Sequence, residues 1–293
     1  MTTISIPSLG DSFSDFEILF NLHTLVGQNE KEIIFDFPKC SFLKQNAIAF
    51  LGGLARTFQK SGCVVSFEWS SLKPEVEKTL AQNGFIQAFG GTEKTWEPGD
   101  FIPYREERFQ DPANQIEYLS KNWLGRLWGQ SHISPKLHGA IVGRVWELYA
   151  NAFEHGQSEV GLFVCGQHYG GSQELKLAVC DFGIGIPNNV RRFFKNDGIA
   201  SEKALQWALL RGTTTKPGLM GRGVGLDILK EFIKLNNGKM QIFSNDGYAE
   251  IGQNADIYST RTPFLQGTLF NITFKCDDKL YHYASEKTAD VFF

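Results

Sequence analysis

Side chains that can hold a proton or a ligand recur at helical spacing in the segment VGRVWELYANAFEHG. Glu147, Asn151 and His155 follow one another at intervals of four residues, which places a carboxylate, an amide and an imidazole on one ridge of a helix expected over 135–155. A solvated helix face commonly carries the same residues, and any single Glu-x-x-x-Asn is most often explained that way. This pattern points to chemistry only if other motifs accompany it.

A second pattern is LKLAVCDFGIGIP. The apolar run 175–180 predicts a buried strand that ends at Asp181, and Gly183 and Gly185 follow. A carboxylate at a strand end can accept a hydrogen bond from an exocyclic amine, and alternate glycines let the backbone approach a flat ligand closely. A plain glycine-rich turn would look the same. The Asp-Phe-Gly triplet also occurs in protein kinases, but the chain has neither an H-R-D loop nor a V-A-I-K strand.

A third pattern is GLMGRGVGLDILKEF, in which Gly221, Gly223 and Gly225 lead into a helix expected over 226–236. Backbone N–H groups exposed by glycines at a helix N-terminus form a site for anions such as phosphates. The spacing is not the Rossmann G-x-G-x-x-G, and no Walker A sequence occurs in the chain.

The elements that must position these motifs fall into two parts. Strand-like runs at 31–37 and 63–69 alternate with helical segments, the second of them at 74–85, which predicts β-α-β-α units and a parallel sheet. From residue 90 onward the segment is rich in proline, glycine and charge. The expected division is a first domain over 1–90, a linker over 91–114 and a second domain over 115–293.

Composition narrows the class of protein. The chain has 293 residues, 42% of them hydrophobic, and a formal net charge of −3, so no basic field indicates a nucleic-acid or anionic-membrane partner. The longest apolar stretch, 47–55, is far shorter than the roughly 20 residues of a membrane span, and the first residues lack the features of a signal peptide. The five cysteines show no C-x-x-C spacing, which argues against disulfides and zinc. We therefore expect a cytoplasmic protein.

The three motifs in this order, ELYANAFEHG, DFGIGIP and GRGVGL, resemble the N, G1 and G2 boxes of the GHKL superfamily of gyrase, heat-shock chaperone, histidine kinase and mismatch-repair ATPases. The resemblance covers about residues 135–275 and includes the closing strand GTLFNITF. It implies an α/β sandwich of the Bergerat type, in which a mixed sheet carries helices on one face and ATP lies against those helices.

The resemblance also implies roles for residues. Asn151 would ligate Mg²⁺ that bridges the ATP phosphates. Asp181 would accept a hydrogen bond from the adenine amine, and Thr268 would assist the recognition of adenine. Gly183 and Gly185 would allow the backbone to approach the adenine base closely. The range 188–220 would form a lid over ATP. Its Thr214, Thr215 and Lys216 would contact the γ-phosphate, unless they are only a solvated turn. The residues that would wrap the phosphates are Gly221, Arg222, Gly223, Val224, Gly225 and Leu226.

Glu147 distinguishes the subclasses of the superfamily. In its ATPases and its anti-sigma-factor-like serine kinases, a glutamate at this place is the general base, because it lies one helical turn from the Mg²⁺ asparagine. A histidine kinase would need a phosphoacceptor histidine, and His132 and His138 lack the H-E-x-[RK]-x-P surroundings. Two-component phosphotransfer is therefore disfavoured.

The N-terminal half resembles the STAS fold, the antagonist module of partner-switching systems, in its β-α-β-α pattern. The phosphoacceptor run D-[ST]-S-G of that family is replaced by FLKQNA, and Ser41 is not in register with it. The combined expectation is an ATPase that works as an ATP-dependent conformational switch with a protein partner, with no membrane partner and with a homodimer left open. One alternative is a serine/threonine kinase that acts on a separate STAS-like partner, and another is an ATP-binding adaptor that hydrolyses little.

Overall fold

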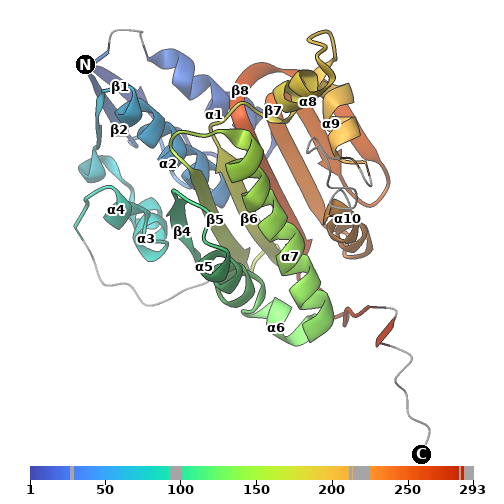
Figure 1. Ribbon diagram of the computed structural model, residues 1–293. Coiled ribbons are helices and arrows are strands. Elements are labelled where there is room, and N and C mark those ends of the chain that lie inside the picture. Colours follow the sequence, from blue (N-terminus) through green and yellow to red (C-terminus); the bar gives the residue numbers. More distant parts are fainter. Residues whose placement is uncertain (27–29, 93–100, 211–212, 214–224, 284, 287–293) are drawn as a thin grey trace, which may run out of the picture.

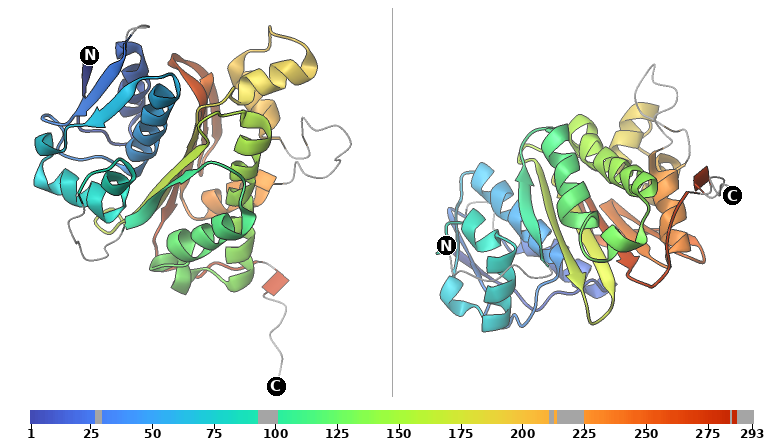
Figure 2. Two further views of the ribbon diagram at one scale, coloured as in Figure 1. Left: turned by 60° about the vertical axis from the view of Figure 1, so that its left-hand side comes forward. Right: turned by 90° about the horizontal axis from the view of Figure 1, so that it is seen from below.

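The computed structural model describes residues 1–26, 30–92, 101–210, 213, 225–283 and 285–286. Its strands form two sheets, and helix α2 (Gln45–Lys60) lies between them (Figures 1 and 2). Helix α7 (Pro135–Asn151) covers the opposite face of the second sheet (Figure 2). Within the described part of the chain, no helix is long and apolar enough to cross a bilayer.

The first sheet is parallel, as the sequence predicts. Its strands β1 (Thr2–Ser5), β2 (Glu32–Asp36) and β3 (Val64–Phe67) pair in that order. The sequence did not reveal β1, which is only four residues long. Besides α2, this half contains α1 (Phe13–Asn21), η1 (Leu22–Leu25), η2 (Trp69–Ser71), α3 (Pro74–Gln82) and α4 (Phe85–Ala88).

The second sheet has the order β4-β5-β6-β8-β7. Its strands are β4 (Phe101–Glu107), β5 (Leu162–Tyr169), β6 (Glu174–Asp181), β7 (Lys239–Ile251) and β8 (Asp256–Lys275). The remaining elements are α5 (Pro112–Glu117), α6 (Trp128–His132), α8 (Ile186–Phe194), α9 (Ser201–Ala208), α10 (Gly225–Leu235) and the π-helical segments η3 (Tyr118–Leu124) and η4 (Ala152–Gly156).

Two details of this half differ from expectation. The range 91–114, expected as a linker, contains β4, which pairs with β5 and so belongs to the second sheet. As an edge strand that carries Pro103 and charged residues, β4 shows little of the alternation that reveals a strand. The sheet was also expected to be mixed, whereas all of its described pairings are antiparallel. Short connections join β5 to β6 and β7 to β8, and such hairpins force antiparallel pairing.

Successive residues of the inner strands are buried on opposite faces of the second sheet. One set packs with the N-terminal half: Phe163, Cys165, Ala178, Cys180, Phe243, Leu265 and Leu269. The other set packs with α7 and α10: Leu162, Val164, Leu177, Val179, Met240, Ile242, Phe270 and Ile272. The resemblance implied helices on one face, but α2 packs on β5 and β6 from the other side, so both faces are covered.

Polar groups fix where α2 sits on the sheet. Gln45 is fully buried; its amide donates to Asn271 Oδ1 at 2.8 Å, and its carbonyl accepts from the Tyr169 hydroxyl at 2.8 Å. At the other end of α2, Arg56 pairs with Glu106 of β4 at 2.9 Å. Because buried polar groups are costly unless paired, these bonds select one docked position of the helix.

The segment 245–267 forms the outer halves of β7 and β8, which pair from Gly247 opposite Thr260 to Ile251 opposite Asp256. This hairpin packs against α9 and also reaches α1, where the Arg261 guanidinium lies 4.5 Å from the centre of the Phe20 ring. It therefore joins the N-terminal half to the helices that follow β6.

Candidate nucleotide-binding site

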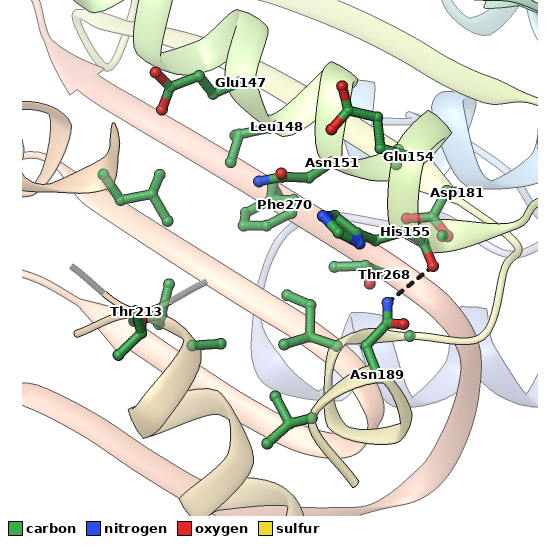
Figure 3. A pocket seen from close by; sticks show the side chains of 18 of the residues that line it. Glu147, Leu148, Asn151, Glu154, His155, Asp181, Asn189, Thr213, Thr268 and Phe270 are labelled. Atoms are coloured by element: carbon green, nitrogen blue, oxygen red, sulfur yellow. Dashed lines mark hydrogen bonds between the residues drawn. The ribbon is translucent and has the colours of Figure 1, made fainter. Parts of the chain in front are cut away.

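The end of α7 forms one wall of a pocket on the face of the second sheet that α2 does not cover. The N-terminus of α7 is capped: the Ser134 hydroxyl accepts a hydrogen bond from the Leu137 N–H, and Pro135 occupies the first turn. Near its end, Glu147 and Asn151 line the pocket one turn apart, and the chain then continues into the π-helical η4 (Figure 3). The predicted ridge of polar side chains on α7 thus faces a cavity.

Asp181 and Thr268 lie at the other end of the pocket from Glu147 (Figure 3). They are cross-strand partners on β6 and β8. Asp181 is 5% exposed, and burial raises the pKa of its carboxyl to about 7, although hydrogen bonds from the Gly183 and Thr268 backbone oppose the shift. The Gly183 N–H donates to Asp181 Oδ1 at 2.8 Å. This arrangement leaves a buried carboxyl as a hydrogen-bonding group at the pocket wall.

Both glycines that follow Asp181 have a structural reason. Gly183 lies too close to another backbone segment for a side chain, and Gly185 has a positive φ. A Cβ on Gly183 would lie 1.8 Å from the carbonyl oxygen of Gly156, at the end of η4. Gly185 lines the pocket with a φ of +82°, a region that side chains disfavour. Gly183 therefore lets the end of β6 pack against the end of η4, and Gly185 is the N-cap residue of α8 at the pocket wall.

Thr268 is held by its neighbours. Its hydroxyl lies 2.9 Å from Ser244 Oγ, and the Ser244 hydroxyl accepts the Ile186 N–H at 2.8 Å. The closing strand β8 is thereby tied to β7 and to the first turn of α8, all at the same end of the pocket.

Several lining residues were not singled out from the sequence. Asn189 of α8 donates to the His155 carbonyl at 2.9 Å (Figure 3). Trp207 of α9, Thr213 and Asp227 also line the pocket. Asn189, Trp207 and Thr213 fall within 188–220, so the expected lid range was the only signal for them. His155, which the ridge on α7 included, also lines the pocket.

Two residues of the predicted phosphate site belong to the described part of the chain. Gly225 is the first residue of α10, and Leu226 lines the pocket. The remaining predicted contacts lie outside the described residues: Thr214, Thr215, Lys216, Gly221, Arg222, Gly223 and Val224.

Comparison with protein families gives a match to the histidine kinase-, DNA gyrase B- and HSP90-like ATPases over residues 141–278. The matched range includes Glu147, Asn151, Asp181 and Thr268, which the fold brings to one pocket. Residues 141–278 form a GHKL ATPase domain. All residues that line the pocket, called the GHKL pocket below, belong to this domain. Comparison with curated proteins gives no match for the chain.

The match begins within α7, so the N-terminal half lies outside the GHKL domain's matched range. The parallel sheet and the β-α-β-α order there are confirmed, and the resemblance to STAS stays a prediction.

The residues around the GHKL pocket fit a magnesium ion that is held mainly by phosphates. Asn151 offers an exposed amide oxygen on the pocket wall. In the described part of the chain, no group of three or more His, Cys, Asp or Glu side chains is arranged to hold a metal. Mg²⁺ in nucleotide sites typically takes one or two protein oxygens and completes its shell with phosphates and water. Asn151 matches that requirement.

Proposed function

We propose that this protein is a Mg²⁺-dependent ATPase that serves as a conformational switch for a protein partner. One observation carries the proposal: Glu147 and Asn151 line the GHKL pocket one turn apart on α7, and the buried Asp181 lines it on the far side of Asn151 from Glu147 (Figure 3). This separation suits a nucleotide with its base at Asp181 and its phosphates at Asn151. The range 188–220 would respond to the bound nucleotide, and a ligand-driven change in such a segment is a common way to alter a binding surface.

The chemistry would be shared between two residues of α7. Asn151 would contribute an oxygen to Mg²⁺, which neutralises phosphate charge when bound. Glu147 would act as general base and accept the proton of the water that attacks the γ-phosphate. With Glu147 about one third exposed, solvent water can reach its carboxylate.

A second candidate is an ATP-binding adaptor with little hydrolysis, and the surroundings of Glu147 favour it. The guanidinium of Arg144 donates to Glu147 Oε1, so one of the two carboxylate oxygens already has a partner. A serine/threonine kinase that acts on a STAS-like partner would use the same pocket and the same Glu147, with a seryl hydroxyl in place of water.

Calorimetric titration of the full chain with ATP and Mg²⁺, followed by measurement of phosphate release, tests the proposal. Binding with steady release of phosphate supports the ATPase. Binding without release favours the adaptor, and transfer of the γ-phosphate to an added protein favours the kinase. An absence of binding at millimolar ATP contradicts all three. Hydrogen exchange in 188–220 with ATP and with ADP then tests the switch, which requires different protection in the two states.

A further inference from the structure

Phe182 follows Asp181 directly but points to the other face of the sheet. Asp181 lines the GHKL pocket, whereas the Phe182 ring packs in the core shared with the N-terminal half. Its centroid lies 5.2 Å from that of Phe50 on α2 and 6.1 Å from that of Phe163 on β5. Neighbouring residues of an extended chain point to opposite faces, so one peptide unit links the pocket to the N-terminal half.

Helix α2 has a recess where this ring sits. A Cβ on Gly53 would lie 2.1 Å from Phe182 Cε2 and 2.7 Å from Phe163 Cδ2. Any larger residue at position 53 would push one or both rings away. A glycine inside a helix is less favourable than alanine, and here it permits close contact between α2 and Phe182.

The backbone around Asp181 has few other bulky anchors. Laterally, Asp181 is held between Leu162 of β5 and Thr268 of β8. On its C-terminal side the sequence is Phe-Gly-Ile-Gly, and the two glycines restrict the chain little. Perpendicular to the sheet, both neighbours of Asp181, Cys180 and Phe182, pack on the α2 side, and Phe182 has the larger side chain of the two.

We propose that Phe182, seated against Phe50 and Gly53 of α2, is a positioning residue for adenine recognition by Asp181. Selectivity for adenine then depends on the docked N-terminal half and not only on the GHKL domain. This inference rests on the proposed function, in which Asp181 accepts the adenine amine. A small movement of the ring would shift the carboxyl away from the amine while leaving the phosphate end of the pocket unchanged.

The test compares ATP with inosine triphosphate, which carries a carbonyl oxygen in place of the amine. Titration of the full chain gives the ratio of the two dissociation constants for the wild type, Phe182→Leu and Gly53→Ala. Both variants should reduce the preference for ATP by about three- to tenfold, because one hydrogen bond is weakened. Affinity for inosine triphosphate should stay unchanged, which a general loss of folded protein would not allow.

Phe35→Leu is the matched control. Phe35 is fully buried in the same core, where its ring contacts Phe58 and Phe67. Phe35→Leu should lower thermal stability and keep the wild-type preference for ATP. An unchanged preference in both Phe182→Leu and Gly53→Ala would overturn the inference, as would an equal loss in Phe35→Leu. A wild type that binds ATP without preferring it would refute base recognition by Asp181, and a wild type that binds no ATP would refute the proposed function itself.

Discussion

Arg144 Nη1 lies 2.5 Å from Glu147 Oε1, three residues further along α7. The two side chains are 27% and 33% exposed; Glu147 lines the GHKL pocket, and Arg144 is not among the lining residues. An exposed pair of this kind contributes little to stability, about 0–1 kcal/mol. Its importance lies in the partner that it gives to the Glu147 carboxylate, which lines the pocket.

Glu147→Ala should leave ATP affinity nearly unchanged, since the carboxylate is expected to contact the nucleophile and not the nucleotide. Turnover should fall by about 10²–10⁴, the usual contribution of a general base. Calorimetry for binding and a phosphate-release assay for turnover measure the two effects separately. A variant that binds and turns over ATP at the wild-type rate would show that Glu147 is only a helix-face residue.

Arg144→Ala should release Glu147 Oε1 and raise the rate of ATP hydrolysis by about two- to tenfold, because the oxygen no longer accepts the guanidinium bond. The dissociation constant for ATP and the melting temperature should change little. Single-turnover phosphate release is the measurement. A rate that drops more than tenfold would mean that Arg144 instead holds Glu147 in its working position.

Asp181→Asn should weaken ATP binding by about 10- to 150-fold, the effect of losing a charged hydrogen bond of 1.5–3 kcal/mol. An amide cannot offer two acceptor oxygens to the adenine amine and a bridging water. Calorimetric titration at pH 8 checks this, because most of the wild-type carboxyl is ionised there. Equal affinity for the variant and the wild type would remove Asp181 from the binding site.

The same substitution should stabilise the ligand-free protein. Burial raises the pKa of Asp181 in the folded state from 3.8 to about 7, so stability is lost as pH rises through this window. Each pKa unit corresponds to about 1.4 kcal/mol. The advantage of Asp181→Asn should therefore be small near pH 4, grow to a few kcal/mol by pH 7 and then level off. Urea unfolding at several pH values measures it, and an advantage that shrinks with pH would contradict the sign.

The sequence could single out the main candidate residues because each is marked by a pattern of neighbouring residues in the chain. Glu147 and Asn151 share a helix face by spacing alone, and Asp181 is marked by the end of an apolar run followed by glycines. Their order along the chain identified the superfamily, and the structure then placed all three around one pocket.

Only the tertiary structure decided what covers the second sheet. A strand stretch buried on both faces is apolar on both, so the run 177–180 could not show that Cys180 faces α2 while Val179 faces α7. The bond between Gln45 and Asn271 joins residues 226 apart in the chain, a separation at which no spacing rule applies. The contact between Phe182 and Gly53 has the same origin: the sequence marks Phe182 as a neighbour of Asp181, and only packing shows which helix holds it.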